Sequence, residues 1–260
     1  MLKDLLAVLN YRTMLKTTIS KELRARYKGS VLGFLWTFVN PLLQLLVYSI
    51  TFKYVMRISV PGVNYSLFLF VGLVPWTCFS ASLLMGANVI VANSNLIKKI
   101  HFPRLILPLS SVLGNIVNLL LTMCILLPVL WLNGNPININ YLYLPIIIAL
   151  LAIMNLGFVL IFSGLNVYFR DLEHILGVLL MGWMYVSPII YSADNIPGHT
   201  YDLFKANPMF PVVTSFQDIL IYNKGPDLLA LFYLGCFALA ILFAGYASYT
   251  KMQRRFAEEL

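Results

Sequence analysis

The stretch LILPLSSVLGNIVNLLLTMCILLPVLWLNGNPININYLYLPIIIALLAIMNLGFVLIFSGLNVYF, residues 105–169, decides the fold because it contains no charged residue. One membrane-spanning helix needs about 20 apolar residues, so this stretch is too long for a single span. The cluster NGNP at 133–136 consists of turn-forming residues and divides it. We therefore predict two transmembrane helices, at about 106–132 and 143–167.

Charge-free stretches on either side predict four further spans, at about 30–52, 66–90, 175–192 and 228–250. The composition agrees, because 60% of the 260 residues are hydrophobic and 11% are charged, whereas soluble domains carry about 25% charged residues. Six such helices leave too little chain for a soluble catalytic domain. We expect an all-α fold, in which residues 1–260 form one polytopic membrane domain with six transmembrane helices.

The basic residues are distributed unevenly between the two sides of these spans. All but four of the 18 lysines and arginines fall in the two ends and in the connections on the same side; the exceptions are Lys53, Arg57, Lys205 and Lys224. Cytoplasmic loops carry such an excess of Lys and Arg, so both termini are expected in the cytoplasm. The same asymmetry accounts for the formal net charge of +8, and no nucleic-acid partner is expected.

Three segments outside the spans have patterns of their own. Residues 1–28 place apolar residues at every fourth position among many charges, which predicts a helix in the cytoplasmic membrane interface; a plain basic tail is the alternative. Residues 93–104 (NSNLIKKIHFPR) are basic and amphipathic, and predict either a short helix that docks in a soluble partner or a loop that only sets topology. Residues 193–226 are broken by prolines but apolar at 210–222, which predicts short outer half-helices that re-enter the membrane.

The predicted spans lack the residues that catalytic or ion-coupled membrane proteins need. No Asp, Glu, Lys, Arg or His lies in the core of a span, which disfavours a proton relay. The three histidines are far apart in the sequence, so no metal site is expected. The nearest approach to a phosphate-binding loop, Gly177–Gly182, has Trp183 where a lysine is required. We expect no enzyme activity, cofactor or nucleotide site in this chain, so active transport would draw its energy from a partner.

Uncharged polar and aromatic residues are instead frequent in or near the spans, among them Asn40, Gln44, Trp183 and Tyr191. Amides and flat rings suit a path for neutral hydroxylated ligands such as sugars. The alternative is structural, because amides bond between transmembrane helices and Trp and Tyr form interfacial belts.

Five sequence blocks, in order along nearly the whole chain, resemble those of the ABC-2 type permeases that export polysaccharides. They are RYKGSVLGFLW at 26–36 followed by NPL at 40–42, LFLFVGLVPW at 67–76, the segment 93–108, YFRDL at 168–172, and SPIIY at 187–191 with NP at 207–208. The resemblance implies a homodimer of the permease, paired with two copies of a separate ABC ATPase subunit in the bacterial cytoplasmic (inner) membrane. The first and fifth spans of both copies would line a channel, and the cargo would be a lipid-linked polysaccharide, either O-antigen on undecaprenyl pyrophosphate or a teichoic acid polymer.

The site residues follow from this resemblance and from helical periodicity. The channel-lining candidates are Trp36, Asn40, Gln44 and Tyr48 on the first span, where the first three share one helical face, and Trp183 and Tyr191 on the fifth. The ATPase-coupling candidates are Leu96, Ile97, Lys98, Lys99, Ile100 and Phe102. Arg24, Arg26 and Lys28 are expected either to contact the lipid pyrophosphate or only to orient the first span.

Other functions agree less well with the sequence. An ABC-2 permease for a drug or a lipo-oligosaccharide would differ only in its cargo. A membrane-embedded glycosyl- or phosphotransferase would need acidic residues at the membrane surface, where Asp171 and Glu173 are the candidates. A passive channel or a structural membrane protein would need no ATPase partner.

Overall fold

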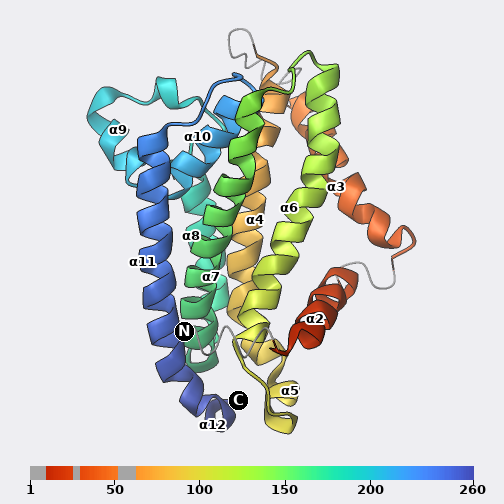
Figure 1. The fold of residues 1–260 in the computed structure, drawn as a ribbon, viewed down its shortest axis with the longest axis vertical. Coiled ribbons are helices and arrows are strands. Elements are labelled where there is room, and N and C mark those ends of the chain that lie inside the picture. The colour runs from red at the N-terminus through yellow and green to blue at the C-terminus, as the bar shows by residue number, and fades with distance from the viewer. Residues whose placement is uncertain (1–9, 26–29, 52–62) are drawn as a thin grey trace.

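The computed structural model describes residues 10–25, 30–51 and 63–260, and helices form most of this part of the chain (Figure 1). Four long helices run along the bundle: α4 (Tyr65–Ala92), α6 (Ile106–Leu132), α7 (Leu144–Tyr168) and α11 (Leu228–Met252). The shorter helices are α2 (Arg12–Ala25), α3 (Trp36–Tyr48), α5 (Ser94–Lys99), α8 (Leu172–Val186), α9 (Gly198–Lys205), α10 (Met209–Leu220) and α12 (Phe256–Glu259). Short 3₁₀ turns occur at Gly33–Leu35, Ile139–Tyr143, Ala193–Asn195 and Gln253–Arg255.

The helical character of the fold is confirmed, and four described helices are long and apolar enough to cross a membrane. They are Tyr65–Ala92, Ile106–Leu132, Ile139–Tyr168 and Leu228–Arg255. The helices of the first and fifth predicted spans are shorter, with 13 residues in α3 and 15 in α8. The count of six spans therefore stays a prediction.

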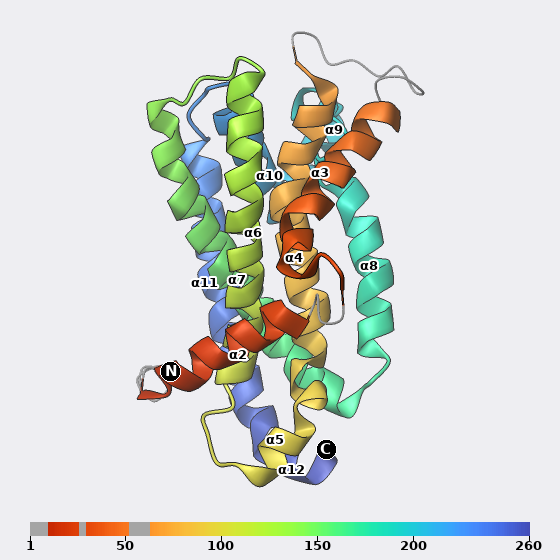
Figure 2. The ribbon, with the colours of Figure 1, turned by 90° about the vertical axis from the view of Figure 1, so that its right-hand side faces the viewer.

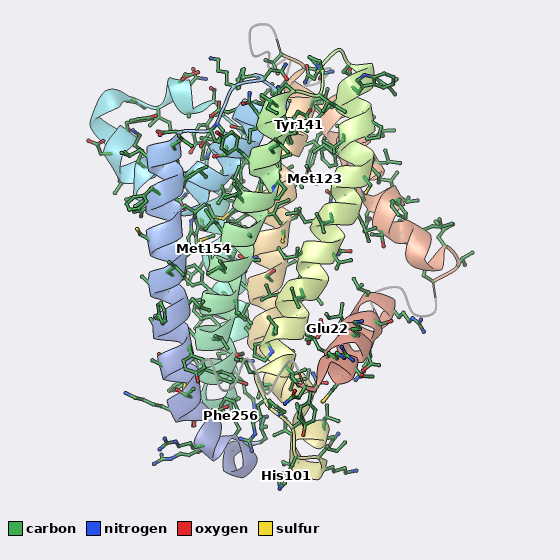
Figure 3. The ribbon with its side chains drawn as sticks, in the orientation of Figure 1. Glu22, His101, Met123, Tyr141, Met154 and Phe256 are labelled. Carbon is green, nitrogen blue, oxygen red and sulfur yellow. The ribbon has the colours of Figure 1, made fainter. Side chains whose placement is uncertain are left out.

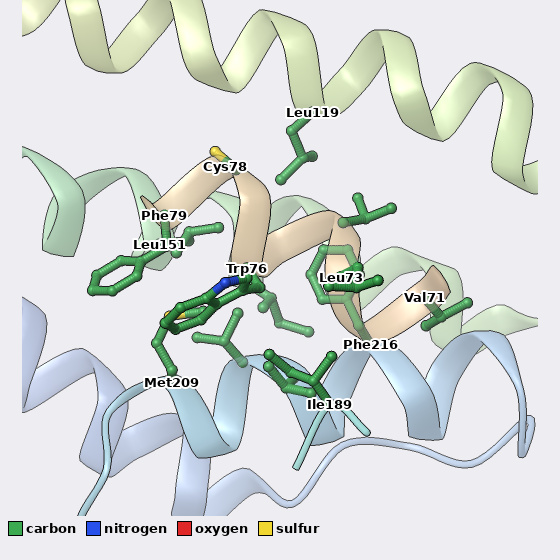
Figure 4. Packing of buried hydrophobic residues seen from close by; sticks show 14 of the residues in the cluster. Val71, Leu73, Trp76, Cys78, Phe79, Leu119, Leu151, Ile189, Met209 and Phe216 are labelled. Carbon is green, nitrogen blue, oxygen red and sulfur yellow. The ribbon is translucent and has the colours of Figure 1, made fainter. Parts of the chain in front are cut away.

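Helix α4 is the centre of the bundle. It contacts α3, α6, α7, α8 and α10, and it is apolar on all sides, as expected of a helix that is covered all round. Asn64 begins it by accepting a hydrogen bond from the Ser66 amide at 3.2 Å through its side-chain oxygen. Figure 4 shows Trp76 and Phe79 of this helix packed among residues from other elements, including Met209 and Phe216 of α10.

The segment between α8 and α11, for which outer half-helices were predicted, contains the two short helices α9 and α10. α10 is buried against α4 and also contacts α7 and α11, whereas α9 lies at the edge of the bundle in Figure 1. Asn207 and Pro208 stand at the start of α10. That these helices re-enter a membrane stays a prediction.

Helix α2 crosses the lower part of α6 rather than running along the bundle (Figure 2). Ser110 of α6 donates a hydrogen bond from Oγ to Glu22 Oε1 at 3.2 Å, and Figure 3 labels Glu22 beside α6. Of the predicted interfacial segment 1–28, α2 is thus a helix fixed to the bundle by a polar contact, and residues 1–9 and 26–28 lie outside the described residues. That α2 lies in a membrane interface stays a prediction.

Candidate functional site

One side of α3 holds it against the bundle. Thr37 and Pro41 are its buried residues, and the helix contacts α4 and α6. The other side is exposed and apolar, and consists of Leu35, Leu42, Leu43, Leu46, Val47 and, just beyond the helix, Ile50. Only Thr37 and Pro41 of α3 are buried, so most of the helix surface is left uncovered by the rest of the described chain.

A cavity of about 450 Å³ lies between α3, α4 and α6. Its polar lining consists of Thr37, Asn40, Gln44, Thr77, Asn118 and Thr122, and its apolar lining of Pro41, Phe70, Leu73, Val74 and Ala81. None of these lining residues is charged. The volume falls in the range of small-molecule sites, about 300–1,000 Å³.

The polar groups of this cavity are only partly satisfied within the protein. Thr77 donates from Oγ1 to the Val74 carbonyl at 3.0 Å, and Thr122 donates from Oγ1 to the Asn118 carbonyl at 2.9 Å. Each hydroxyl oxygen keeps lone pairs that can accept a hydrogen bond. By contrast, Thr37 Oγ1 and Asn118 Oδ1 are buried and have no hydrogen-bond partner in the part of the chain that the structure describes.

The structure separates the four channel-lining candidates of the first span into two pairs. Asn40 and Gln44 line the cavity and are exposed. Trp36 and Tyr48 are half-buried and do not belong to its lining, and Tyr48 packs against the main hydrophobic core. The polar side of α3 therefore faces α4 and α6 of its own chain.

The helix of the fifth predicted span ends before the predicted boundary. α8 ends at Val186, and the chain turns at Ser187 and Pro188, because proline cannot donate the hydrogen bond that would continue the helix. Trp183 lies on α8 and Tyr191 lies beyond it, so the two rings do not share a helical face. Tyr191 donates from its hydroxyl to the Tyr185 carbonyl at 3.0 Å.

Trp183 is anchored in the bundle. Its ring meets Phe79 edge-on, with 5.1 Å between ring centroids and 77° between planes. Its Nε1 donates to Asn207 Oδ1 at 2.8 Å. Asn207 also accepts from the Met209 amide at 2.9 Å and donates to Ser187 Oγ at 3.0 Å. Asn207 therefore joins the end of α8 to the start of α10.

The segment predicted to contact an ATPase forms the lower tip of the protein, where Figure 3 labels His101. Lys98, Lys99, Ile100 and His101 are exposed. Ile97 is only 5% exposed and belongs to a core cluster that also contains Phe256, and Leu96 and Phe102 pack against this cluster. Of the six coupling candidates, only Lys98, Lys99 and Ile100 thus present their side chains outward.

Comparison of this sequence with known proteins identifies the family of the chain. Residues 13–221 match the sequence profile of the ABC-2 type transporter family. The chain belongs to this family. The O-antigen export system permease protein RfbA of Myxococcus xanthus is 35% identical over 252 residues, 96% of each chain, and RfbA of Klebsiella pneumoniae is 35% identical over 249 residues, 95% of each chain. The polysialic acid transport protein KpsM of Escherichia coli is 27% identical over 234 residues, 88% of this chain and 89% of KpsM.

The tip of this ABC-2 permease is tied to its C-terminal segment by contacts that the sequence did not predict. Arg104, which follows α5, donates from Nη1 to the Gln253 carbonyl. Tyr249 of α11 donates from its hydroxyl to the Arg104 carbonyl at 3.2 Å. Nothing in the sequence indicated these distant partners.

A second cavity of the permease, of about 460 Å³, lies among α9, α10 and α11. Its lining includes three tyrosines and four aspartates, which are Tyr201, Tyr222, Tyr233, Asp194, Asp202, Asp218 and Asp227. Burial raises the pKa of the Asp218 carboxyl to about 6; Lys224 opposes this shift, and Asp194 and Asp227 add to it.

The basic residues predicted to contact a lipid pyrophosphate are described only in part. Arg24 is exposed on the last turn of α2. Arg26 and Lys28 lie outside the described residues, so the structure does not test this prediction.

Proposed function

We propose that this chain is the permease subunit of an ABC exporter that carries a lipid-linked O-antigen polysaccharide across the cytoplasmic membrane. The observation that carries the proposal is the similarity, at 33–35% identity over 95–96% of this chain, to proteins named O-antigen export system permeases. An ATPase subunit, present in two copies, supplies the energy, since the sequence contains no phosphate-binding loop.

The lining of the cavity between α3, α4 and α6 supports a neutral, hydroxyl-rich cargo. The cavity beside α3 has amide and hydroxyl groups and no charged side chain. Amides and hydroxyls can both donate and accept hydrogen bonds, as sugar hydroxyls do. An ion-coupled carrier would need ionisable groups at this depth.

The homodimer is proposed from membership of the ABC-2 type transporter family. Leu42, Leu46 and Val47 are each about half exposed, and a second copy of the permease would cover them. In this arrangement α3 and α8 complete a set of six spans, with both termini and the tip at Lys98–His101 in the cytoplasm, where the ATPase binds.

Deletion and complementation test the proposed function. Deleting the gene should trap lipid-linked O-antigen on the cytoplasmic leaflet without stopping its synthesis, and the wild-type gene should restore surface polymer. Surface polymer is measured by immunoblot and the trapped glycan by analysis of extracted lipids. Normal surface O-antigen in the deletion strain would contradict the proposal.

A second candidate is export of a capsular polysaccharide. The polysialic acid transport protein KpsM matches 88% of this chain at 27% identity. The lower identity favours O-antigen. A deletion strain that loses capsule but keeps O-antigen would support this second function.

A further inference from the structure

The coupling segment, residues 93–104, is attached to the rest of the protein in two different ways. The chain itself joins it to α4, from which Asn93 alone separates α5, and to α6, which begins after Leu105. Side-chain contacts join it instead to the C-terminal end of α11, at residues 145 and 149 positions away in the sequence. These contacts decide which helices follow the segment when a bound partner displaces it.

Arg104 makes two hydrogen bonds to this end of α11. Its guanidinium donates from Nη1 to the Gln253 carbonyl, and its own carbonyl accepts from the Tyr249 hydroxyl at 3.2 Å. A hydrogen bond with an ionised donor is stronger than one between neutral groups. Tyr249 is only 1% exposed, so water has little access to its side chain. The two bonds hold both the side chain and the backbone of Arg104, which fixes its orientation as well as its place.

Apolar packing adds to these hydrogen bonds. Ile97 of α5 belongs to the same buried cluster as Tyr249 and Phe256. The rings of Tyr249 and Phe256 meet edge-on, with 5.5 Å between centroids and 75° between planes, and the Arg104 guanidinium lies 6.0 Å from the centroid of Phe256. Figure 3 labels Phe256 and His101 together at the lower end of the protein. Closely packed interiors transmit a displacement rather than absorb it, so the segment and this end of α11 are mechanically joined.

The end of α7 belongs to the same unit. Tyr168, the last residue of α7, donates from its hydroxyl to the Met252 carbonyl of α11 at 3.1 Å. The chain then turns, and α8, the helix of the fifth predicted span, begins at Leu172. A displacement of the coupling segment is therefore passed through α11 and α7 to the start of α8.

We propose that Arg104 and Tyr249 are positioning residues of the transport cycle. They fix the coupling segment to the C-terminal end of α11, so that the segment and the ends of α7 and α11 move as one body when the ATPase changes conformation. In this role neither residue touches ATP or the cargo. The inference rests on the proposed function, because it takes an ATPase to bind at the coupling segment. The alternative is a segment that follows α4 and turns freely against α11.

Arg104→Ala tests the proposal by removing the guanidinium contacts with Gln253 and Phe256. We expect the ATPase to copurify and ATP hydrolysis by the purified complex to stay within about twofold of the wild type. Surface polymer in the complemented deletion strain should fall at least about fivefold, because movement of the ATPase is no longer passed to α11. Arg104→Lys should keep at least about half of the wild-type polymer, since its ammonium can still donate to the Gln253 carbonyl.

Surface polymer relative to ATP hydrolysed is the deciding quantity, because a loss of folded permease lowers both together. Tyr249→Phe removes only the hydroxyl and should lower this ratio about two- to fivefold. The matched control is Arg254→Ala, which removes the same charge from an exposed position in the turn after α11 and should leave the ratio unchanged. An unchanged ratio in both Arg104→Ala and Tyr249→Phe, or an equal fall in Arg254→Ala, would overturn the inference.

A cross-link distinguishes one moving body from a segment that turns against α11. In a background where Cys78, Cys124 and Cys236 are replaced by alanine, the double variant Arg104→Cys/Gln253→Cys lacks the native contact. A short bis-thiol reagent then joins the two positions in inverted membrane vesicles from a glycan-producing strain. Transport is measured as the ATP-dependent share of lipid-linked glycan that is protected from added glycosidase.

The cross-link should restore at least about half of the transport shown by the cysteine-free permease, whereas the single variant Arg104→Cys treated in the same way should stay about fivefold lower. A cross-linked permease that hydrolyses ATP but stays inactive in transport would show that the segment must move against α11, and would overturn the inference. The proposed function fails separately, if the wild-type complex itself moves no glycan in these vesicles.

Discussion

Gly157 on α7 and Gly245 on α11 face each other across the most extensive contact among the described helices. A methyl group built on Gly245 would overlap the carbonyl oxygen of Gly157, and one built on Gly157 would lie 2.7 Å from the carbonyl carbon of Ile241. Glycine at both positions therefore lets the two backbones meet, as in the small-residue contacts of other membrane helices. Because backbone atoms cannot move aside singly, any side chain here must separate the helices.

Gly245→Ala should destabilise the permease by about 1–3 kcal/mol, because it forces α7 and α11 apart. The melting temperature of the purified protein measures this effect. Gly235→Ala, on the same helix, is the control: its added methyl would meet only the side chain of Leu150 at 3.8 Å. An equal melting temperature for the two variants would show that the close approach is not needed.

The second prediction concerns the tip of the permease. Ile100 is 53% exposed and Ile97 is 5% exposed, although both lie in the predicted coupling segment. Ile100→Asp should abolish copurification of the ATPase and leave the melting temperature of the permease unchanged, because Ile100 is half exposed and does not belong to the described core clusters. Ile97→Asp should instead destabilise the permease itself, since it buries an unpaired charge in the core beside Phe256.

Ile97→Val serves as the control for position 97, and it should retain both folding and ATPase binding. Copurification on a tagged permease and thermal unfolding of the permease alone are the two measurements. Full ATPase binding by Ile100→Asp would show that the exposed tip is not the coupling surface.

Charge-free stretches predicted the long helices well, because hydrophobicity and length alone decide whether a segment can cross a membrane. The NGNP cluster marked the turn between α6 and α7, and the apolar stretch at 210–222 overlaps α10. The predicted fifth span extended beyond the end of α8. The charge-free stretch continues to Ala193, but the helix ends at Val186, before Pro188. Asn207 donates hydrogen bonds to the Val186 carbonyl and to Ser187 Oγ at this end.

The candidate site was harder to predict than the fold. Periodicity placed Asn40 and Gln44 on one side of a helix, and both line the cavity beside α3. Periodicity cannot say which neighbours that side faces, so Thr77 and Thr122 were missed. The contact of Arg104 with Gln253 also depends on a distant pairing that only the folded chain creates.

The third prediction tests the hydrogen bond between Trp183 and Asn207. Asn207 is 8% exposed, and its amide makes hydrogen bonds to Trp183, Ser187 and the Met209 amide. Asn207→Ala should destabilise the permease by about 2–4 kcal/mol, because several buried groups lose their partner together. Melting temperatures of Asn207→Ala, Trp183→Phe and the double variant form a cycle, and the double variant should be more stable than the sum of the single effects predicts. If the two single effects on the melting temperature simply add up, the Trp183 indole N–H and the Asn207 side chain contribute to stability independently.

Asp218 introduces a pH dependence at the outer end of α10. Its pKa in the folded protein is raised from 3.8 to about 6, mainly by burial. Between these values the folded chain holds a proton that the unfolded chain has released. The free energy of unfolding therefore falls as the pH rises from about 4 to about 6, and the whole destabilisation caused by Asp218 is present above pH 6.

Asp218→Asn should remove this pH dependence, because its neutral amide resembles the protonated carboxyl. At pH 7.5 we expect the variant to be more stable than the wild type by about 1–2 kcal/mol, a value reduced for solvent screening of a partly exposed group. At pH 4.5 the difference should shrink, since the wild-type carboxyl is then protonated in the folded state. Thermal unfolding at the two pH values measures both differences. Asp202→Asn is the control, because Asp202 lines the same cavity from exposed α9 and should leave the pH dependence of the melting temperature as in the wild type. A stability gain for Asp218→Asn that is equal at both pH values would show that protonation of Asp218 is not coupled to folding.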